Sequence, residues 1–209
     1  MARNPKRLVL NVGAGPRDGR PLHPAFDPSA WTETRVDIDA HADPDIVASI
    51  IDMQRHISSA RFDAVWSSHV LEHLHAHDVP LALAEYRRVL RPTGFALVTS
   101  PDLEVVARIV LEHGLDHVAY TAPAGPITAL DMLFGHSDSI AQGNVHMAHR
   151  TGFTCAALAE ALLDAGFATV LAKSVRFDLW VVALMERADT AAIQEELKSA
   201  GLDMVAADD

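Results

Sequence analysis

The stretch LVLNVGAG at residues 8–15 joins an apolar run directly to a pair of glycines. The run is not interrupted by alternating polar residues, which is typical of a strand buried on both faces of a parallel sheet. Because glycine has no side chain, the turn that follows lets the backbone approach a ligand closely. Gly19 does not complete the spacing G-x-G-x-x-G, since residue 18 is Asp. The pattern therefore disfavours a nicotinamide dinucleotide site.

Strand-like and helix-like segments alternate downstream of this stretch. Further strands are predicted over residues 34–38, 46–50, 64–67, 95–100, 168–172 and 179–185. Helical spacing of apolar residues predicts helices over residues 79–90, 103–113 and 154–165. Asp78 and Thr154 are the expected N-caps of the first and last of these helices. The alternation predicts a three-layer α/β sandwich, with ligands at the carboxyl ends of the strands.

The chain length of 209 residues fits a single domain over residues 1–209. Residues 120–152 are rich in Gly, Pro, His and Ser and show no long periodic segment. A long irregular stretch inside a domain is usually functional, and its apolar residues favour an ordered cap insert. A surface helix and an acidic tail are expected from about residue 187.

The charge balance narrows the classes of partner. The 17 basic and 28 acidic residues give a net charge of −11, which disfavours nucleic acid and anionic membranes as partners. Cys155 is the only cysteine, so an internal disulfide and a Cys-rich zinc site are excluded. Neither a membrane span nor a signal peptide is expected, and the predicted location is cytoplasmic.

A second ligand-binding motif is VDID at residues 36–39, at the end of the next predicted strand. An acid about 20 residues after the glycines suits hydrogen bonding to ribose hydroxyls. An ordinary solvated strand end is the alternative. Together with the glycine turn, the motif favours a nucleoside ligand.

Two further stretches, FDAVWSSHVLEHL at 62–74 and RRVLRPTGFALVTSPD at 87–102, complete a series of four motifs. In this order and spacing, the chain resembles the class I S-adenosylmethionine-dependent methyltransferases, especially the small bacterial members. The resemblance covers roughly residues 6–186. It implies a Rossmann-like fold with a mostly parallel seven-stranded sheet whose last strand, LWVVALM at 179–185, is antiparallel.

The resemblance also implies which residues bind S-adenosylmethionine. They follow the ends of the predicted strands and are Asn11, Gly13, Ala14, Gly15, Asp37, Ile38, Asp52, Met53, Ser67 and Ser68. The glycine turn is expected under the methionine part, Asp37 on both ribose hydroxyls and Ile38 against adenine. Asn11 stands where the family usually has an acid, so its contact with the cofactor's ammonium is expected to be weaker or water-mediated. Residues 16–30 make a poor first helix, which leaves that wall of the site undefined.

Four of the twelve histidines in the chain are the candidate catalytic residues. His69 follows the fourth strand, beside the expected sulfonium, while His136, His146 and His149 lie in the cap insert. Histidine is the natural base near neutral pH, so one of them could deprotonate the acceptor. The alternative is that the insert histidines only fix the shape of the insert.

The segment HVLEH at residues 69–73 also matches H-x-x-E-H, a zinc-protease signature whose two histidines would share one helical face. A zinc site needs a third ligand, and none is evident downstream. The methyltransferase resemblance accounts for the segment, so no metal ligand is predicted.

The predicted function is S-adenosylmethionine-dependent methyl transfer to a small-molecule acceptor, with oxygen as the first choice of acceptor atom. Two alternatives stay open. One is a non-catalytic S-adenosylmethionine-binding module, which the departure at Asn11 favours. The other is an enzyme that performs different chemistry on the same cofactor. The interpretation leaves room for a homodimer.

Overall fold

The computed structural model describes residues 5–17, 19, 21–122 and 125–204. Its main sheet has seven strands in the order β3-β2-β1-β4-β5-β9-β8. The strands are β1 (Arg7–Val12), β2 (Trp31–Asp37), β3 (Ile46–Val47), β4 (Phe62–Ser68), β5 (Leu90–Pro101), β8 (Thr169–Val175) and β9 (Asp178–Leu184). β9 runs antiparallel to both of its neighbours, β5 and β8, and the other neighbouring pairs are parallel. The mostly parallel seven-stranded sheet with an antiparallel last strand is thus confirmed.

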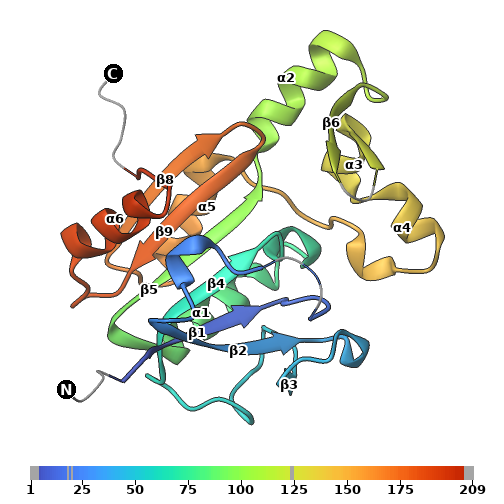
Figure 1. Ribbon diagram of the computed structural model, residues 1–209. Coiled ribbons are helices and arrows are strands. Elements are labelled where there is room, and N and C mark those ends of the chain that lie inside the picture. Colours follow the sequence, from blue (N-terminus) through green and yellow to red (C-terminus); the bar gives the residue numbers. More distant parts are fainter. Residues whose placement is uncertain (1–4, 18, 20, 123–124, 205–209) are drawn as a thin grey trace.

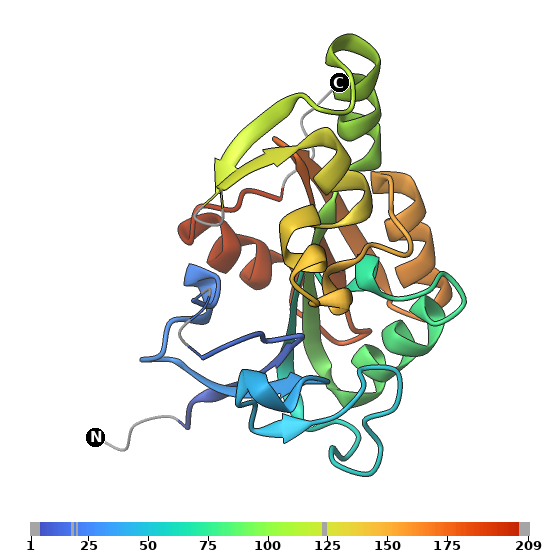
Figure 2. The same ribbon diagram turned by 90° about the vertical axis from the view of Figure 1, so that its right-hand side faces the viewer.

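Helices cover both faces of the sheet (Figures 1 and 2). On one face lie α1 (Val79–Val89) and α5 (Cys155–Asp164), whose buried leucines share a cluster with the sheet. On the other lie the 3₁₀ turn η1 (Pro24–Phe26) and α6 (Thr190–Ser199), packed around a second cluster. The three-layer sandwich is therefore confirmed, and the long helix α2 (Leu103–His113) extends from the end of β5.

Several predicted boundaries are wrong in detail. The third strand is only two residues long, and Leu90 belongs to β5 rather than to α1. Asp78 makes no capping hydrogen bond, because its own backbone is already helical, with φ −88° and ψ −21°. The Thr154 cap is confirmed, since its side chain accepts the Ala157 N–H.

Residues 16–30 form no α-helix among the positions described, in line with their poor helical pattern; residues 18 and 20 lie outside the description. The acidic tail at 205–209 also lies outside it. Among the residues described, no helix combines the length and the apolar character that crossing a membrane requires.

The expected insert contains more secondary structure than its sequence indicates. We call residues 118–152 the cap; positions 123 and 124 are not described. It consists of a hairpin, two short helices and a 3₁₀ turn, namely β6 (Val118–Ala122), β7 (Gly125–Thr128), α3 (Ala129–Phe134), α4 (Ser137–Ala141) and η4 (Val145–Met147). Figure 2 shows the helices of the cap in front of the carboxyl edge of the sheet. That the chain forms one domain stays a prediction.

The cap has its own packing constraint at Gly135. This residue has φ +93°, and a Cβ there would lie 1.9 Å from the Met147 carbonyl oxygen. Gly143, with φ +98°, has nothing within 4 Å of the same position. Both glycines relieve backbone strain, but only Gly135 is also needed for close packing inside the cap.

We expect Gly135→Ala to loosen the cap far more than the matched change Gly143→Ala. Left-handed strain alone costs about 1–2 kcal/mol, and the overlap at Gly135 adds about 1–3 kcal/mol. Hydrogen exchange of the cap amides measures the difference, because the His149 N–H donates to the Phe134 carbonyl within the cap. Equal acceleration in the two variants would mean that Gly135 holds no packing role.

Candidate active site

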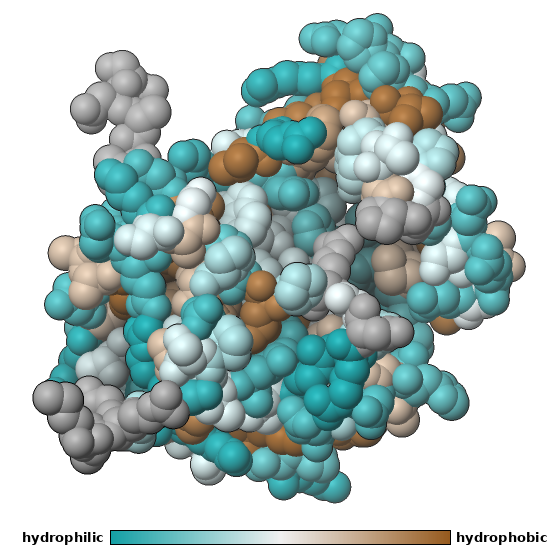
Figure 3. All heavy atoms as spheres, in the orientation of Figure 1, coloured by the Kyte–Doolittle hydropathy of each residue, from teal (hydrophilic) through white to brown (hydrophobic). Residues whose placement is uncertain are grey.

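A cavity of about 950 Å³ opens between the glycine turn and the cap. The ends of β1 and β4 line it on one side, and the cap residues Ile127, Met132 and His136 line it on the other. Figure 3 shows the surface hollowed between the cap and the part of the molecule that carries the sheet. The cavity lies at the carboxyl edge of a parallel sheet, where ligands of such folds bind, and its size suits a small molecule.

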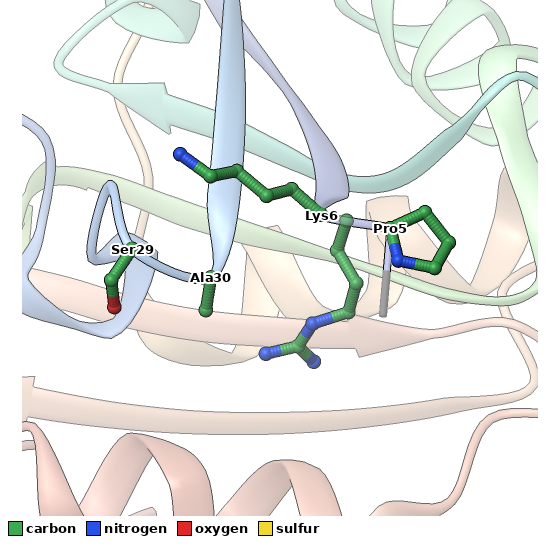
Figure 4. Close-up of a pocket in the computed structure, with 5 residues that line it drawn as sticks. Pro5, Lys6, Ser29 and Ala30 are labelled. Carbon is green, nitrogen blue, oxygen red and sulfur yellow. The ribbon is translucent and has the colours of Figure 1, made fainter. Parts of the chain in front are cut away.

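A second, smaller hollow of about 360 Å³ lies beside Pro5, Lys6, Ser29 and Ala30 (Figure 4). These residues precede β1 and β2, at the opposite edge of the sheet from the glycine turn. Of the four residues labelled in Figure 4, Pro5 and Ala30 have side chains without a polar group. We therefore place the functional site in the larger cavity.

The two glycines of the turn serve different purposes. Both have left-handed backbones, with φ +60° at Gly13 and +63° at Gly15. A Cβ on Gly13 would lie 2.6 Å from Cγ2 of Val70, so this glycine makes room for the segment after β4. A Cβ on Gly15 would meet nothing within 4 Å. Gly15 therefore leaves open space on the cavity side, which is the cradle that a ligand needs.

A buried arginine holds the turn from behind. Nη2 of Arg35, a residue only 6% exposed, donates to the carbonyls of Ala14, Gly15 and Pro16 at 2.9, 3.0 and 3.2 Å. Its Nη1 donates to Glu33 Oε1 at 2.9 Å, and the same oxygen accepts from Asn11 Nδ2 at 2.7 Å. Glu33 thus places a carboxylate beside Asn11, which stands where the resembled family usually has an acid.

Asp37 contacts the turn directly. Its Oδ2 accepts the Gly15 N–H at 2.8 Å, and its Oδ1 accepts the Asp39 N–H at 2.9 Å. A carboxylate accepts about four hydrogen bonds, so the capacity for two hydroxyl donors remains. Asp37 is partly buried and Ile38 is 58% exposed, and neither lines the cavity itself. Asp37 adjoins the cavity through Gly15, which it contacts and which lines the cavity.

Among the expected cofactor contacts that follow β3 or lie at the end of β4, Ser68 lines the cavity, whereas Asp52, Met53 and Ser67 do not. Ser68 lines the cavity, and its hydroxyl accepts from Thr99 at 3.2 Å. Asp52 is exposed. The Met53 side chain is fully buried, and its backbone N–H donates to Glu85. The Ser67 hydroxyl is buried 3.0 Å from the Tyr86 hydroxyl, so its side chain has a structural partner away from the cavity.

The segment after β4 is not the helix that its sequence predicts. His69 has φ +55°, and only Leu71–His73 forms a 3₁₀ turn, η3. Nδ1 of His69 lies 3.2 Å from Glu72 Oε1, and its Nε2 lies 3.6 Å from Asp178 Oδ1. Burial alone would raise the pKa of the Glu72 carboxyl, but the neighbouring His69 and His73 imidazoles hold it below its usual value. A carboxylate and several imidazoles therefore meet in one wall of the cavity.

The cap histidines do not all reach this wall. His136 and His149 line the cavity, whereas His146 is exposed and does not. The His149 ring lies 4.9 Å from the ring of His73, centroid to centroid. Burial lowers the pKa of the His149 imidazole, which keeps it neutral.

Sequence reasoning missed Glu33 and Arg35, which support the site. They alternate along β2 with the predicted Asp37, so the three side chains leave the same face of the strand. That period of two was a usable signal. No sequence pattern indicated that Glu72 and His73 lie close to His149, because this proximity depends on the path of the cap.

A comparison with family models found one match over the first five strands of the main sheet. Residues 10–98 match the family described as a methyltransferase domain. This stretch holds the glycine turn, the second-strand acid and the segments after β4 and in β5. Over these residues the chain is similar to methyltransferase domains. The match ends before the cap, so it carries no information on the acceptor.

Solved structures share the fold of this chain at low identity. The 1,6-didemethyltoxoflavin-N1-methyltransferase of Burkholderia thailandensis, with 1,6-didemethyltoxoflavin and S-adenosylhomocysteine bound, is 19% identical, with TM-score 0.52 over 86% of this chain and 71% of that one. A SAM-dependent methyltransferase from Archaeoglobus fulgidus is 13% identical, with TM-score 0.54 over 86% of each chain. An O-methyltransferase family protein from Burkholderia thailandensis is 13% identical, with TM-score 0.51 over 86% and 51%. No match was found among curated proteins.

S-adenosylmethionine is the cofactor that the sequence predicts, and the N1-methyltransferase of the same fold holds S-adenosylhomocysteine. The described residues fit it on three counts. Gly15 leaves open space beside the turn, Asp37 keeps acceptor capacity next to it, and the adjoining cavity has room for a methionine chain and a small acceptor.

Proposed function

We propose that this chain is an S-adenosylmethionine-dependent methyltransferase that acts on a hydroxyl group of a small molecule bound beneath the cap. The observation that carries the proposal is the continuity of one cavity from the glycine turn to the cap histidines. S-adenosylmethionine, when bound, supplies an electrophilic methyl group at its sulfonium. Gly13, Ala14 and Gly15 hold its methionine part, Asp37 its ribose hydroxyls and Ile38 its adenine. Ser68 and His69 lie at the reacting end.

Two features favour a small acceptor. The cap lies over the carboxyl edge, and its side chains Ile127, Met132 and His136 enclose the far side of the cavity. The net charge of −11 disfavours a nucleic acid acceptor. The N1-methyltransferase with the same fold holds 1,6-didemethyltoxoflavin, a small molecule, in its structure.

The histidines favour oxygen as the acceptor atom. In-line orientation of the acceptor accounts for about 7–11 kcal/mol of the barrier to methyl transfer. A hydroxyl must also lose its proton, and a positioned base adds about 10²–10⁴-fold to the rate. His69, His136 and His149 line the acceptor end and are the candidate proton acceptors. The new oxygen–carbon bond forms as the sulfur–carbon bond breaks, with its electron pair left on sulfur.

The test is transfer of a ¹³C-methyl label from S-adenosylmethionine into a desalted metabolite extract. We expect S-adenosylhomocysteine to form and the label to appear in the low-mass fraction at a methoxyl chemical shift. Asp37→Ala serves as the matched variant, and its signal should fall. Label in macromolecules, or on nitrogen or carbon, would overturn the acceptor assignment.

The same assay separates the two alternatives. Cofactor consumption without any acceptor would indicate other chemistry on S-adenosylmethionine. Binding without turnover in every extract would indicate a non-catalytic module. The cytoplasmic location and a homodimer stay predictions from the sequence.

A further inference from the structure

Three metal-ligating side chains meet in the wall of the cavity below the cap. Glu72, His73 and His149 each offer one ligand atom, and these atoms lie within 4.8 Å of one another. All three residues line the cavity. The cluster thus joins Glu72 and His73, the last two residues of the H-x-x-E-H motif, to a histidine from a distant part of the chain, a third ligand that the sequence lacks nearby.

Backbone hydrogen bonds hold the two contributing segments together without help from the ligand side chains. The N–H groups of Arg150 and Thr151 both donate to the Glu72 carbonyl, at 2.8 and 3.2 Å. The His149 N–H donates to the Phe134 carbonyl at 3.1 Å. The cluster is therefore pre-organised by the path of the chain.

Each imidazole is oriented as in a metal ligand. Nδ1 of His73 lies 3.3 Å from the Ala148 carbonyl oxygen, and Nδ1 of His149 lies 3.0 Å from the Met132 carbonyl oxygen. A carbonyl only accepts, so each Nδ1 carries the proton and each Nε2 keeps a free lone pair. Metal-ligating histidines typically anchor their other ring nitrogen on a backbone carbonyl in this way.

The carboxylate is the second indication of a ligand. Glu72 is 1% exposed, and its Oε2 accepts from the Ser100 hydroxyl at 3.3 Å. Its Oε1 is buried and lies 3.2 Å from Nδ1 of His69. Buried charges are ordinarily paired or bound to a metal, so a cation at this buried carboxylate would add to its pairing with His69.

We propose that Glu72, His73 and His149 bind a divalent transition-metal ion. Two imidazoles and one carboxylate form a ligand set that suits Zn²⁺ and related ions, with a fourth position left open to the cavity. Ligands about 2.0–2.2 Å from a tetrahedral ion lie about 3.3–3.5 Å apart. The three atoms therefore need only small side-chain movements to close on the ion.

The open position gives the ion a role in catalysis that rests on the proposed function. A cation there polarises an acceptor hydroxyl and lowers the cost of removing its proton. His149 would then position the ion, and the proton would pass to His69 or His136. The metal site itself does not depend on methyl transfer.

Metal binding is tested on the untagged chain, stripped with chelator and titrated with Zn²⁺ by calorimetry and with Co²⁺ by visible absorption. We expect one equivalent to bind with a tetrahedral Co²⁺ spectrum. His73→Ala and His149→Ala should each weaken binding at least tenfold, and Glu72→Gln should do the same. The matched control is the double variant His113→Ala with His117→Ala, which removes an exposed stacked pair with ring centroids 4.5 Å apart and should bind as the wild type does.

Affinity for S-adenosylhomocysteine shows that the variants are folded, since none of them alters the glycine turn. Absence of stoichiometric binding by the wild type would overturn the site and leave Glu72 paired with His69 only. Equal affinity in the wild type and the His149 variant would overturn it as well. Failure of methyl transfer with intact Co²⁺ binding would overturn the proposed function and leave the metal site standing.

Discussion

Replacing Arg35 by methionine is expected to lower the free energy of unfolding by about 3 kcal/mol. The guanidinium is buried between Glu33 and the carbonyls of Ala14, Gly15 and Pro16. Methionine fills a similar volume but donates no hydrogen bond, so these oxygens lose a donor in a place that water barely reaches. Urea denaturation followed by circular dichroism measures the change.

The matched control is Arg17→Ala. Arg17 also pairs with acids, at 2.9 Å from Asp43 and 2.6 Å from Asp45, but its side chain is exposed. Exposed ion pairs are screened by water and salt, so a far smaller loss of stability is expected. If both variants lost the same stability, burial of Arg35 behind the glycine turn would not be what stabilises the turn.

Replacing Asp37 by alanine is expected to weaken S-adenosylmethionine binding by about 1–3 kcal/mol, or roughly 5- to 150-fold. Two causes act together. The ribose hydroxyls lose their acceptor, and the Gly15 N–H loses the carboxylate that accepts it at 2.8 Å. Isothermal titration calorimetry with S-adenosylhomocysteine gives the affinity without turnover.

Asp39→Ala is the control for this change, because Asp39 lies in the same motif. Its side chain is exposed and accepts the His41 N–H, away from the turn. We expect its affinity to stay within about twofold of the wild type, a difference well below one kcal/mol. An Asp37 variant that binds as tightly as the Asp39 variant would remove Asp37 from the site.

The parallel sheet could be predicted from the sequence because its signals are local. LVLNV and FALV are mainly apolar runs, and α1 and α5 repeat apolar residues at helical spacing. Such patterns report burial directly. The helices inside the cap could not be predicted, because α3 and α4 are six and five residues long and have too few turns to show a period.

The candidate site could likewise be predicted only in part from the sequence. The glycine turn and Asp37 follow strands, and strand ends meet at one edge of a parallel sheet, so their closeness was predictable. The left-handed backbone at His69 was not, because nothing in HVLEH forbids a helix there. Because the segment HVLEH has a helix-like sequence, the sequence also gives no sign that Glu72 and His73 face the cap.

The most direct measurement is a crystal structure of the chain with S-adenosylhomocysteine bound. We predict the homocysteine part along Gly13–Gly15, the ribose on Asp37 and the sulfur facing the space between His69 and the cap. A nucleoside bound elsewhere, or a turn closed by Arg17 or Pro16 with no ligand density, would contradict the account.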